Sequence, residues 1–374
     1  MKFFNHCDKT VRRFGRSGRS VVLWCVGALA ILASSPISTE ATPKTTIGIS
    51  TSLTGPASNY GVDIRNAILF ANKLLANNAY DIVVEDDRCD GKTSMSVAKK
   101  LVEMDRVRAI LGYTCSSSIM AVAPYLERKK VVAIAAGTTA PQIADAGDYI
   151  FRTIQGDDRG VQILFDHALK RYQRLGVLSA QTEWNEGIRT RLSGLAGDTP
   201  LVVQIEEVTP TPYDYKSSLL KLVRRGVDAI FLNVMPEAAF LAALKQLQEL
   251  QFKGDVLAFY HPGSESFRNK VVGPLPPMYY IDNGAPNEIF TPAGREILAQ
   301  FEGEYGPLNS VPLTFASAFE SFRALHEALQ SGGGIPDYLL THSFDGVIGR
   351  WSFDSRGEIV GLDVKMVTFK RQEP

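Results

Sequence analysis

The chain has 374 residues, of which 45% are hydrophobic and 21% are charged, and its 40 basic side chains balance 40 acidic ones. These values are typical of a globular protein and exclude wholesale disorder and collagen-like structure. The neutral balance also excludes a chain-wide basic field that would hold nucleic acid or an anionic membrane. The length is sufficient for two domains of ordinary size.

The first 41 residues differ from the rest in charge. They carry a net charge of +4, whereas the other 333 residues carry −4. The basic stretch ends at Arg19 and leads into residues 21–33, which contain no charge. This run is shorter than the roughly 20 apolar residues that span a bilayer, but it matches the apolar part of a secretory signal. We expect a signal peptide over residues 1–41, cleaved near Ala41; a retained membrane anchor and twin-arginine export are the alternatives.

Two cysteines remain after such a cleavage. Cys7 and Cys25 leave with the presequence, so that Cys89 and Cys115 form an even pair. An even pair in an oxidising compartment is a candidate disulfide. A loop of about 25 residues closed in this way stabilises the fold by roughly 3–4 kcal/mol on the chain-entropy account. Two free buried thiols are the alternative.

Short β-branched runs alternate with helical patterns along the remaining chain. The first series predicts strands over 46–50, 81–85, 109–112 and 131–135, and helices over 64–75, 94–104 and 120–128. After a break near 155–158, the second series predicts strands over 175–179, 202–207, 229–233 and 256–259, and helices over 161–170, 186–195, 216–225 and 238–250. Helices over 292–305 and 313–329 and strands over 346–354 and 364–369 complete the chain. Strands that alternate with helices predict parallel sheets with right-handed crossovers, so we expect an α/β fold of two doubly wound, Rossmann-like lobes.

Catalytic motifs are missing from the sequence. It contains no G-x-G-x-x-G after the first strand, no phosphate-binding loop, no G-x-S-x-G and no H-E-x-x-H. His167, His261, His326 and His342 are scattered without the spacing of metal ligands. We therefore predict no catalytic residue, metal site or cofactor. The alternative is an enzyme on the same scaffold, which would require a convergent nucleophile–base pair.

Two loops rich in small hydroxyl residues follow the third and fourth predicted strands, at 113–118 and 137–141. Ligands of open parallel sheets bind beyond the carboxyl ends of the strands. Each loop leads toward a helix, whose free N–H groups accept a carboxylate without an Arg or Lys. The alternative is that Ser and Thr only cap these helices. The two loops together favour a ligand site.

Several segments, in this order and spacing, resemble the leucine/isoleucine/valine-binding proteins of bacterial ABC importers. They are Gly55-Pro56 with Tyr60-Gly61, and the stretches 85–90, 112–118, 138–141, 150–153, 236–237 and 349–358. The resemblance covers essentially the whole mature chain. It implies two lobes joined by three crossings, with the ligand enclosed between them by hinge closure. Lobe 1 would comprise 42–155 and 285–345, and lobe 2 would comprise 156–284 and 346–374.

The resemblance also assigns residues. It implies a disulfide between Cys89 and Cys115. It places the carboxylate-binding positions on Ser116, Gly137 and Thr139. The ligand-stacking tyrosine of the first lobe falls on Tyr60.

The second lobe departs from the family pattern. A tyrosine position falls on Trp184, which keeps an aromatic wall, and another falls on Val234, which lacks the hydroxyl. Where amino-acid binders place an acid for the ligand ammonium, residues 259–263 read Phe-Tyr-His-Pro-Gly. A buried ammonium without a partner is costly, so these changes favour a solute without one.

Some roles in this lobe stay open. Asp157, Glu183 and Asp282 are the candidate acids for the missing partner. His261 either donates to the ligand or only occupies a strand-end turn. Tyr260 and Trp184 either stack on a flat ligand or pack between the lobes.

The expected function is that of a periplasmic, non-catalytic solute-binding protein that delivers a small carboxylate-bearing solute to an ABC permease in the inner membrane. The solute would be an amino acid, an amide, or an aromatic or aliphatic acid. We expect a monomer without cofactor or nucleic-acid partner. The alternative is a periplasmic sensor that signals to a membrane receptor; a DNA-reading regulator would need a helix-turn-helix segment that residues 1–45 do not provide.

Overall fold

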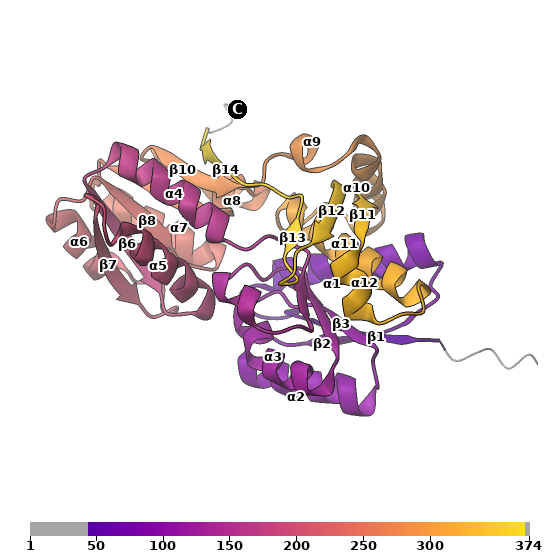
Figure 1. Cartoon of the computed structure of the whole chain (residues 1–374). Helices are drawn as coiled ribbons and strands as arrows, with labels where there is room; N and C mark the ends of the chain where they lie inside the picture. Colours follow the sequence, from indigo (N-terminus) through magenta and orange to yellow (C-terminus); the bar gives the residue numbers. More distant parts are fainter. Residues whose placement is uncertain (1–43, 371–374) are drawn as a thin grey trace, which may run out of the picture. The chain divides into compact units, whose positions relative to one another are not determined.

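The computed structural model describes residues 44–370, so the predicted signal peptide lies outside the described residues. Two sheets, one parallel and one parallel except for an edge strand, form the centres of two lobes, as expected (Figure 1). The lobe 1 sheet has the order β2-β1-β3-β4-β5. Its strands are β1 (Thr46–Thr51), β2 (Asp81–Asp86), β3 (Ala109–Gly112), β4 (Val132–Ala135) and β5 (Ile150–Arg152). All its neighbouring strands are parallel.

Helices cover both faces of the lobe 1 sheet because successive strand residues point to opposite sides. Ala109 and Leu111 of β3 pack in the same core as helices α1 and α11, whereas Ile110 packs with α2 and α3. The helices of this lobe are α1 (Ser58–Ala76), α2 (Gly91–Lys99) with its π-helical extension η1 (Lys100–Met104), α3 (Ser116–Lys129), α9 (Pro286–Ile289), α10 (Pro292–Tyr305), α11 (Pro312–Gln330) and α12 (Ile335–Thr341).

The lobe 2 sheet has the order β14-β10-β9-β8-β6-β7. Its strands are β6 (Arg174–Ala180), β7 (Val202–Val208), β8 (Ala229–Asn233), β9 (Asp255–Phe259), β10 (Met278–Asp282) and the antiparallel edge strand β14 (Lys365–Thr368). The helices are α4 (Asp158–Arg171), α5 (Glu183–Ala196), α6 (Lys216–Arg224), α7 (Glu237–Glu249) and α8 (Glu265–Lys270). Core residues of α4 and α5 cluster on one face of this sheet, and those of α6, α7 and α8 cluster on the other.

The C-terminal region divides between the lobes differently from the expected boundary at 345/346. Strands β11 (Ser343–Gly346), β12 (Gly349–Phe353) and β13 (Ile359–Val360) form a small antiparallel sheet. Its Phe344, Trp351 and Phe353 pack in the lobe 1 core, and the buried Glu320 of α11 accepts a hydrogen bond from Trp351 Nε1 at 2.8 Å. The segment therefore lies with α1 and α11 (Figure 1), and the chain joins the lobe 2 sheet only at β14.

Three passages connect the lobes, after β5, after β10 and before β14. Strands β5 and β10, at which two of them begin, were not among the sequence expectations. They are short and mixed in composition, so their apolar periodicity is weak.

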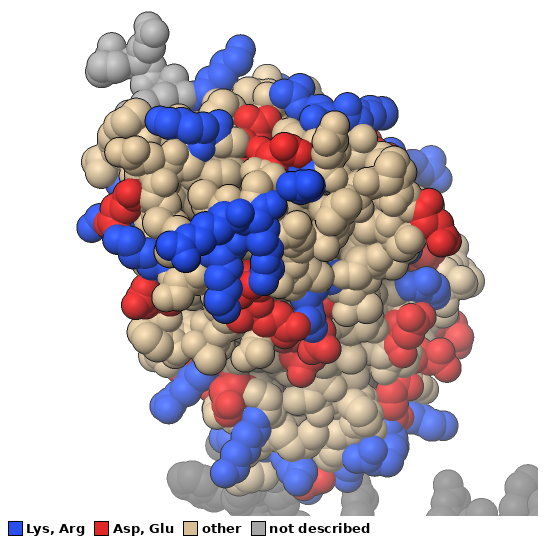
Figure 2. All heavy atoms as spheres, turned by 90° about the vertical axis from the view of Figure 1, so that its left-hand side faces the viewer, with Lys and Arg blue, Asp and Glu red and all other residues tan. Residues whose placement is uncertain are grey.

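Charges of both signs cover the side of the molecule that lies at the left in Figure 1 (Figure 2). Ion pairs of strand β7 illustrate this mixture: Glu206 contacts Lys221 Nζ at 3.2 Å and Arg225 Nη2 at 2.9 Å. Within residues 44–370, no helix is long and apolar enough to cross a membrane.

Candidate functional site

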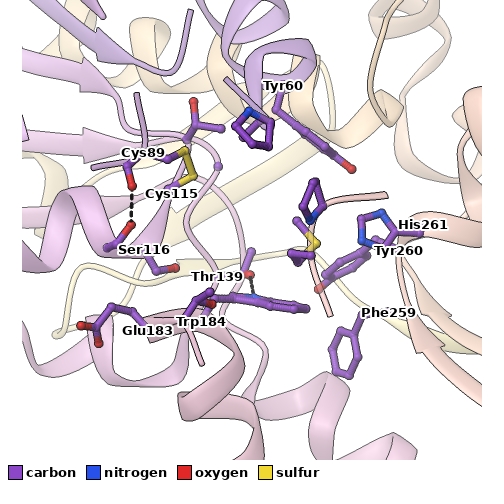
Figure 3. Close-up of a pocket in the computed structure, with 18 of the residues that line it drawn as sticks. Tyr60, Cys89, Cys115, Ser116, Thr139, Glu183, Trp184, Phe259, Tyr260 and His261 are labelled. Carbon is purple, nitrogen blue, oxygen red and sulfur yellow. Dashed lines mark hydrogen bonds between the residues drawn. A yellow bond between two sulfur atoms is a disulfide. The ribbon is translucent and has the colours of Figure 1, made fainter. Parts of the chain in front are cut away.

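A cavity of about 360 Å³ lies where the carboxyl ends of strands from both lobes face each other (Figure 3). This volume is in the range of small-molecule sites. All residues that the sequence singled out for ligand binding line it, namely Tyr60, Ser116, Gly137, Thr139, Trp184, Tyr260 and His261. The structure thus brings the predicted set together at one pocket.

The lobe 1 side of the pocket is built on the start of helix α3. This helix begins at Ser116, so the N–H groups of Ser116 and Ser117 have no carbonyl partner within the helix, whereas Ser118 N donates to the carbonyl oxygen of Cys115 at 3.0 Å. The buried Ser116 hydroxyl oxygen accepts a hydrogen bond from Ala140 N at 3.3 Å, which ties the loop after β3 to the loop after β4. Such a helix start, with hydroxyl groups around it, is suited to a carboxylate.

Gly137 allows these two loops to approach closely. A Cβ atom at this position would lie 2.9 Å from the carbonyl oxygen of Thr114 and 3.0 Å from its Cα. Any larger residue would push the second loop away from the start of α3.

The predicted disulfide between Cys89 and Cys115 is confirmed, with a Cα–Cα distance of 5.3 Å. Beside it, Ser117 Oγ donates to the carbonyl oxygen of Cys89 at 3.1 Å. Both links fix the loop after β2 to the loop that starts α3. They hold the lobe 1 wall of the pocket in place.

Arg152 is a positioning residue to which the sequence analysis assigned no role. Its side chain is 1% exposed, forms an ion pair with Glu358, and donates from Nη1 to the carbonyl oxygens of Thr138 at 3.3 Å and Ala140 at 2.9 Å. The guanidinium thereby clamps the loop after β4 to the segment after β12. Both partners belong to stretches that carried the family resemblance, but nothing in the sequence paired them.

Trp184 and Tyr260 direct their polar atoms toward Asp157 rather than into the pocket. Trp184 Nε1 lies 2.6 Å from Asp157 Oδ2 and 2.7 Å from Thr139 Oγ1, and the Tyr260 hydroxyl donates to Asp157 Oδ1. Trp184 also packs edge-on against Phe259, with ring centroids 6.1 Å apart. The two side chains therefore present ring surface to a ligand (Figure 3).

Asp157 is completely buried in the passage after β5. Burial raises the pKa of its carboxyl group to about 6, although the hydrogen bonds from Thr139, Tyr260 and Trp184 oppose this shift. In an unfolded chain the pKa is about 3.9. The folded state thus holds this proton more tightly, so the contribution of Asp157 to stability is present below about pH 4 and is lost as the pH rises through 6.

Asp157→Asn preserves the shape of the side chain and removes this titration. We expect the stability of the wild type, minus that of the variant, to fall as the pH increases from 4 to 7. Urea unfolding of both proteins at several pH values measures this difference. The contributions of other titrating groups cancel in the difference because both proteins contain those groups. A difference independent of pH would contradict the assignment.

None of the three acids considered from the sequence is a buried, free carboxylate facing the pocket. Asp157 already accepts from Trp184 and Tyr260. Glu183 is exposed, and its carboxylate points away from the aromatic rings in Figure 3. Asp282 is not among the residues that line the cavity and accepts from Asn283 N at 2.9 Å.

His261 lies at the lobe 2 side of the pocket, directly after Tyr260. The residue is 3% exposed, and its ring packs on Phe240 with ring centroids 5.5 Å apart. Neither ring nitrogen makes a hydrogen bond of good geometry with the described residues, although the Val234 backbone lies close enough to the ring to favour its charged form. Burial lowers the pKa of the imidazole to about 4, against the opposing effects of Glu237 and the Val234 carbonyl.

The sequence analysis missed part of the lobe 2 wall. Thr211, Tyr213, Met235 and Pro236 line the cavity, while Val234, at the family's tyrosine position, packs in the core instead. These residues follow β7 and β8, so the rule that ligands bind at the carboxyl ends of strands could have found them. Within residues 44–370, no three His, Cys, Asp or Glu side chains gather as a metal site would require.

A sequence profile described as "periplasmic binding protein" matches residues 44–358 of this chain. A relative from Pseudomonas aeruginosa, a leucine-, isoleucine-, valine-, threonine- and alanine-binding protein, is 25% identical over an alignment of 346 positions that covers 85% of this chain and 87% of the relative.

Solved structures are similar as well. The crystal structure of a leucine-binding protein from Thermotoga maritima has a TM-score of 0.77 at 18% identity, and the match covers 87% of this chain and 95% of the other. A solute-binding protein of an ABC transporter from Rhodopseudomonas palustris, in complex with 4-hydroxybenzoate, has a TM-score of 0.75 at 17% identity, with coverages of 88% and 94%.

Proposed function

This chain belongs to the periplasmic binding protein family, and from this membership we propose that it is the solute-binding component of an ABC importer of the branched-chain-amino-acid type. The resemblance inferred from the sequence is thereby confirmed. The relatives are solute-binding proteins, so the chain is a binding protein and not an enzyme. We propose that an N-terminal signal peptide exports it, that it acts as a monomer in the periplasm, and that it delivers solute to a permease in the inner membrane.

The solute that we propose is a small carboxylate without a neighbouring ammonium group. Its carboxylate would bind the N–H groups at the start of α3, with Ser116, Gly137 and Thr139 around it. We propose that the solute has no ammonium group because no free buried acid is among the residues that line the cavity. An ammonium enclosed there would lose its hydration without gaining a charged partner.

The relatives include binders of both kinds of solute. The Pseudomonas relative is named for amino acids, whereas the Rhodopseudomonas protein was solved with 4-hydroxybenzoate and a further one with benzoate. The aromatic surfaces of Tyr60, Trp184 and Tyr260 suit the flat ring of an aromatic acid.

Hinge closure is the proposed mechanism. The lobes contact each other through Trp184 of α5 and Thr139 of lobe 1, and Gln142 Nε2 donates to the carbonyl oxygen of Glu183 at 2.9 Å. A solute held by lobe 1 residues and by the aromatic rings of lobe 2 binds more tightly when these contacts are made. This differential affinity shifts the population toward the enclosed form, which the permease can distinguish from the open one.

Thermal unfolding tests the solute class. The protein is refolded after denaturation to remove carried-over ligand, and leucine and phenylalanine are compared with 4-methylpentanoate and 3-phenylpropanoate, their analogues without the amine. A solute at 100 times its Kd adds about 2.7 kcal/mol of stability. We expect the acids without an amine, and benzoate, to raise Tm while the amino acids do not; the reverse order would contradict the proposal.

A further inference from the structure

The ring of His261, which makes no hydrogen bond of good geometry, sets this residue apart from the rest of the pocket. Several buried side-chain atoms among residues 44–370 lack a hydrogen-bond partner, but only those of His261 belong to a residue that lines the cavity. A buried polar group left unsatisfied costs about 1–3 kcal/mol. A ligand group that pairs with this ring would remove that cost.

His261 lies opposite the carboxylate-binding side. Ser116 belongs to lobe 1 and His261 follows β9 of lobe 2, and Figure 3 shows them on different sides of the pocket. The Tyr60 hydroxyl points toward the side where His261 lies (Figure 3). A solute whose carboxylate rests on the start of α3 therefore extends its other end toward this ring.

The surroundings of His261 favour a neutral ligand group. The low pKa of the ring keeps it neutral at pH 7, so one ring nitrogen donates and the other accepts. The charged side chain that acts on the ring is Glu237, a carboxylate that accepts from Ser264 and Ser266 and pairs with Lys270 at 3.0 Å. A second ligand carboxylate at this end would be repelled by Glu237. A hydroxyl group can pair with either tautomer of the ring, whereas a carbonyl oxygen pairs only with a donating nitrogen.

We propose that His261 hydrogen-bonds a hydroxyl group of the solute at the end remote from its carboxylate, so that the site selects hydroxy-substituted carboxylic acids, aromatic ones foremost. This inference rests on the proposed function and narrows its solute class. Selection follows because a site with a buried polar group discriminates against the analogue that leaves this group unpaired.

Calorimetric titration with matched ligands tests the inference. The probes are 4-hydroxybenzoate against benzoate, and 3-(4-hydroxyphenyl)propanoate against 3-phenylpropanoate, so that two ligand lengths are covered. With the wild type, the hydroxy acid of the better-fitting length should bind at least about tenfold more tightly than the matched acid without the hydroxyl group. This is the effect of one net hydrogen bond. His261→Phe should lose this preference and retain or improve the affinity for the unsubstituted acid, whereas His261→Gln, which keeps a donor and an acceptor, should retain part of it.

The outcomes separate the two proposals. Equal affinity of the wild type for both members of each pair overturns the role of His261 without touching the proposed function, and so does a preference that persists in His261→Phe. Failure of every carboxylate to bind overturns the proposed function and this inference with it. Circular dichroism and the Tm of each variant report whether the substitution impairs folding. The comparison of ligands on the wild type needs no variant, so it tests the inference even if a variant fails to fold.

Discussion

Replacing Arg152 by methionine is expected to lower the free energy of unfolding by about 3–5 kcal/mol. The substitution leaves the carboxylate of Glu358 without its buried ion-pair partner and the carbonyl groups of Thr138 and Ala140 without their donor. Because these carbonyls belong to the loop that carries Thr139, solute affinity should fall as well. Urea unfolding and calorimetric titration measure the two effects.

Two controls separate this clamp from the general effect of removing an arginine. Arg191→Met breaks an exposed ion pair with Asp158 at 3.5 Å and should cost less than about 1 kcal/mol. Arg152→Met combined with Glu358→Met removes both charges and should recover part of the lost stability. If Arg152→Met lowered the free energy of unfolding no more than Arg191→Met does, the interactions of Arg152 would contribute no more to stability than an exposed ion pair.

Loss of the Cys89–Cys115 disulfide is expected to cost about 2–5 kcal/mol. The bond joins residues 26 positions apart and fixes the start of α3. The double variant Cys89→Ser/Cys115→Ser should therefore have a lower Tm and a weaker affinity for carboxylates than the wild type. Differential scanning calorimetry and ligand titration provide these values.

A reducing agent supplies the matched control for the disulfide. Dithiothreitol should lower the Tm of the wild type toward that of the double variant and leave the variant unchanged. A wild-type Tm that does not respond, in protein shown by thiol titration to be reduced, would mean that the crosslink contributes little to stability.

The sequence predicted well what local patterns determine. Long amphipathic helices such as α1 and α11 have an apolar periodicity, and buried strands such as β1 and β8 have a short run of buried, mostly apolar residues, which are both visible in one segment alone. The strand-end loops at 113–118 and 137–141 were found because parallel sheets place ligands at one edge.

The features that the sequence did not predict depend on contacts between distant segments. The pairing of Arg152 with Glu358 joins residues 206 positions apart, and no local pattern connects them. The assignment of residues 346–360 to lobe 1 depends on Trp351 meeting Glu320 of α11. Likewise, the hydrogen bonds of Asp157 with Trp184 and Tyr260 join residues 27 and 103 positions apart, which no local pattern connects.

The late return of the chain to lobe 1 has a consequence for the order in which the protein folds. Asp63 of α1 accepts hydrogen bonds from Asn309 and Ser310, across about 246 residues of sequence, and α11 supplies much of the lobe 1 core. Strands β6–β10 and their helices, by contrast, are consecutive in the chain. As the polypeptide emerges N-terminus first, lobe 2 can assemble nearly all of its sheet while lobe 1 still waits for its last helices. The half of the pocket that lobe 1 provides can therefore be completed only after most of the lobe 2 sheet is available.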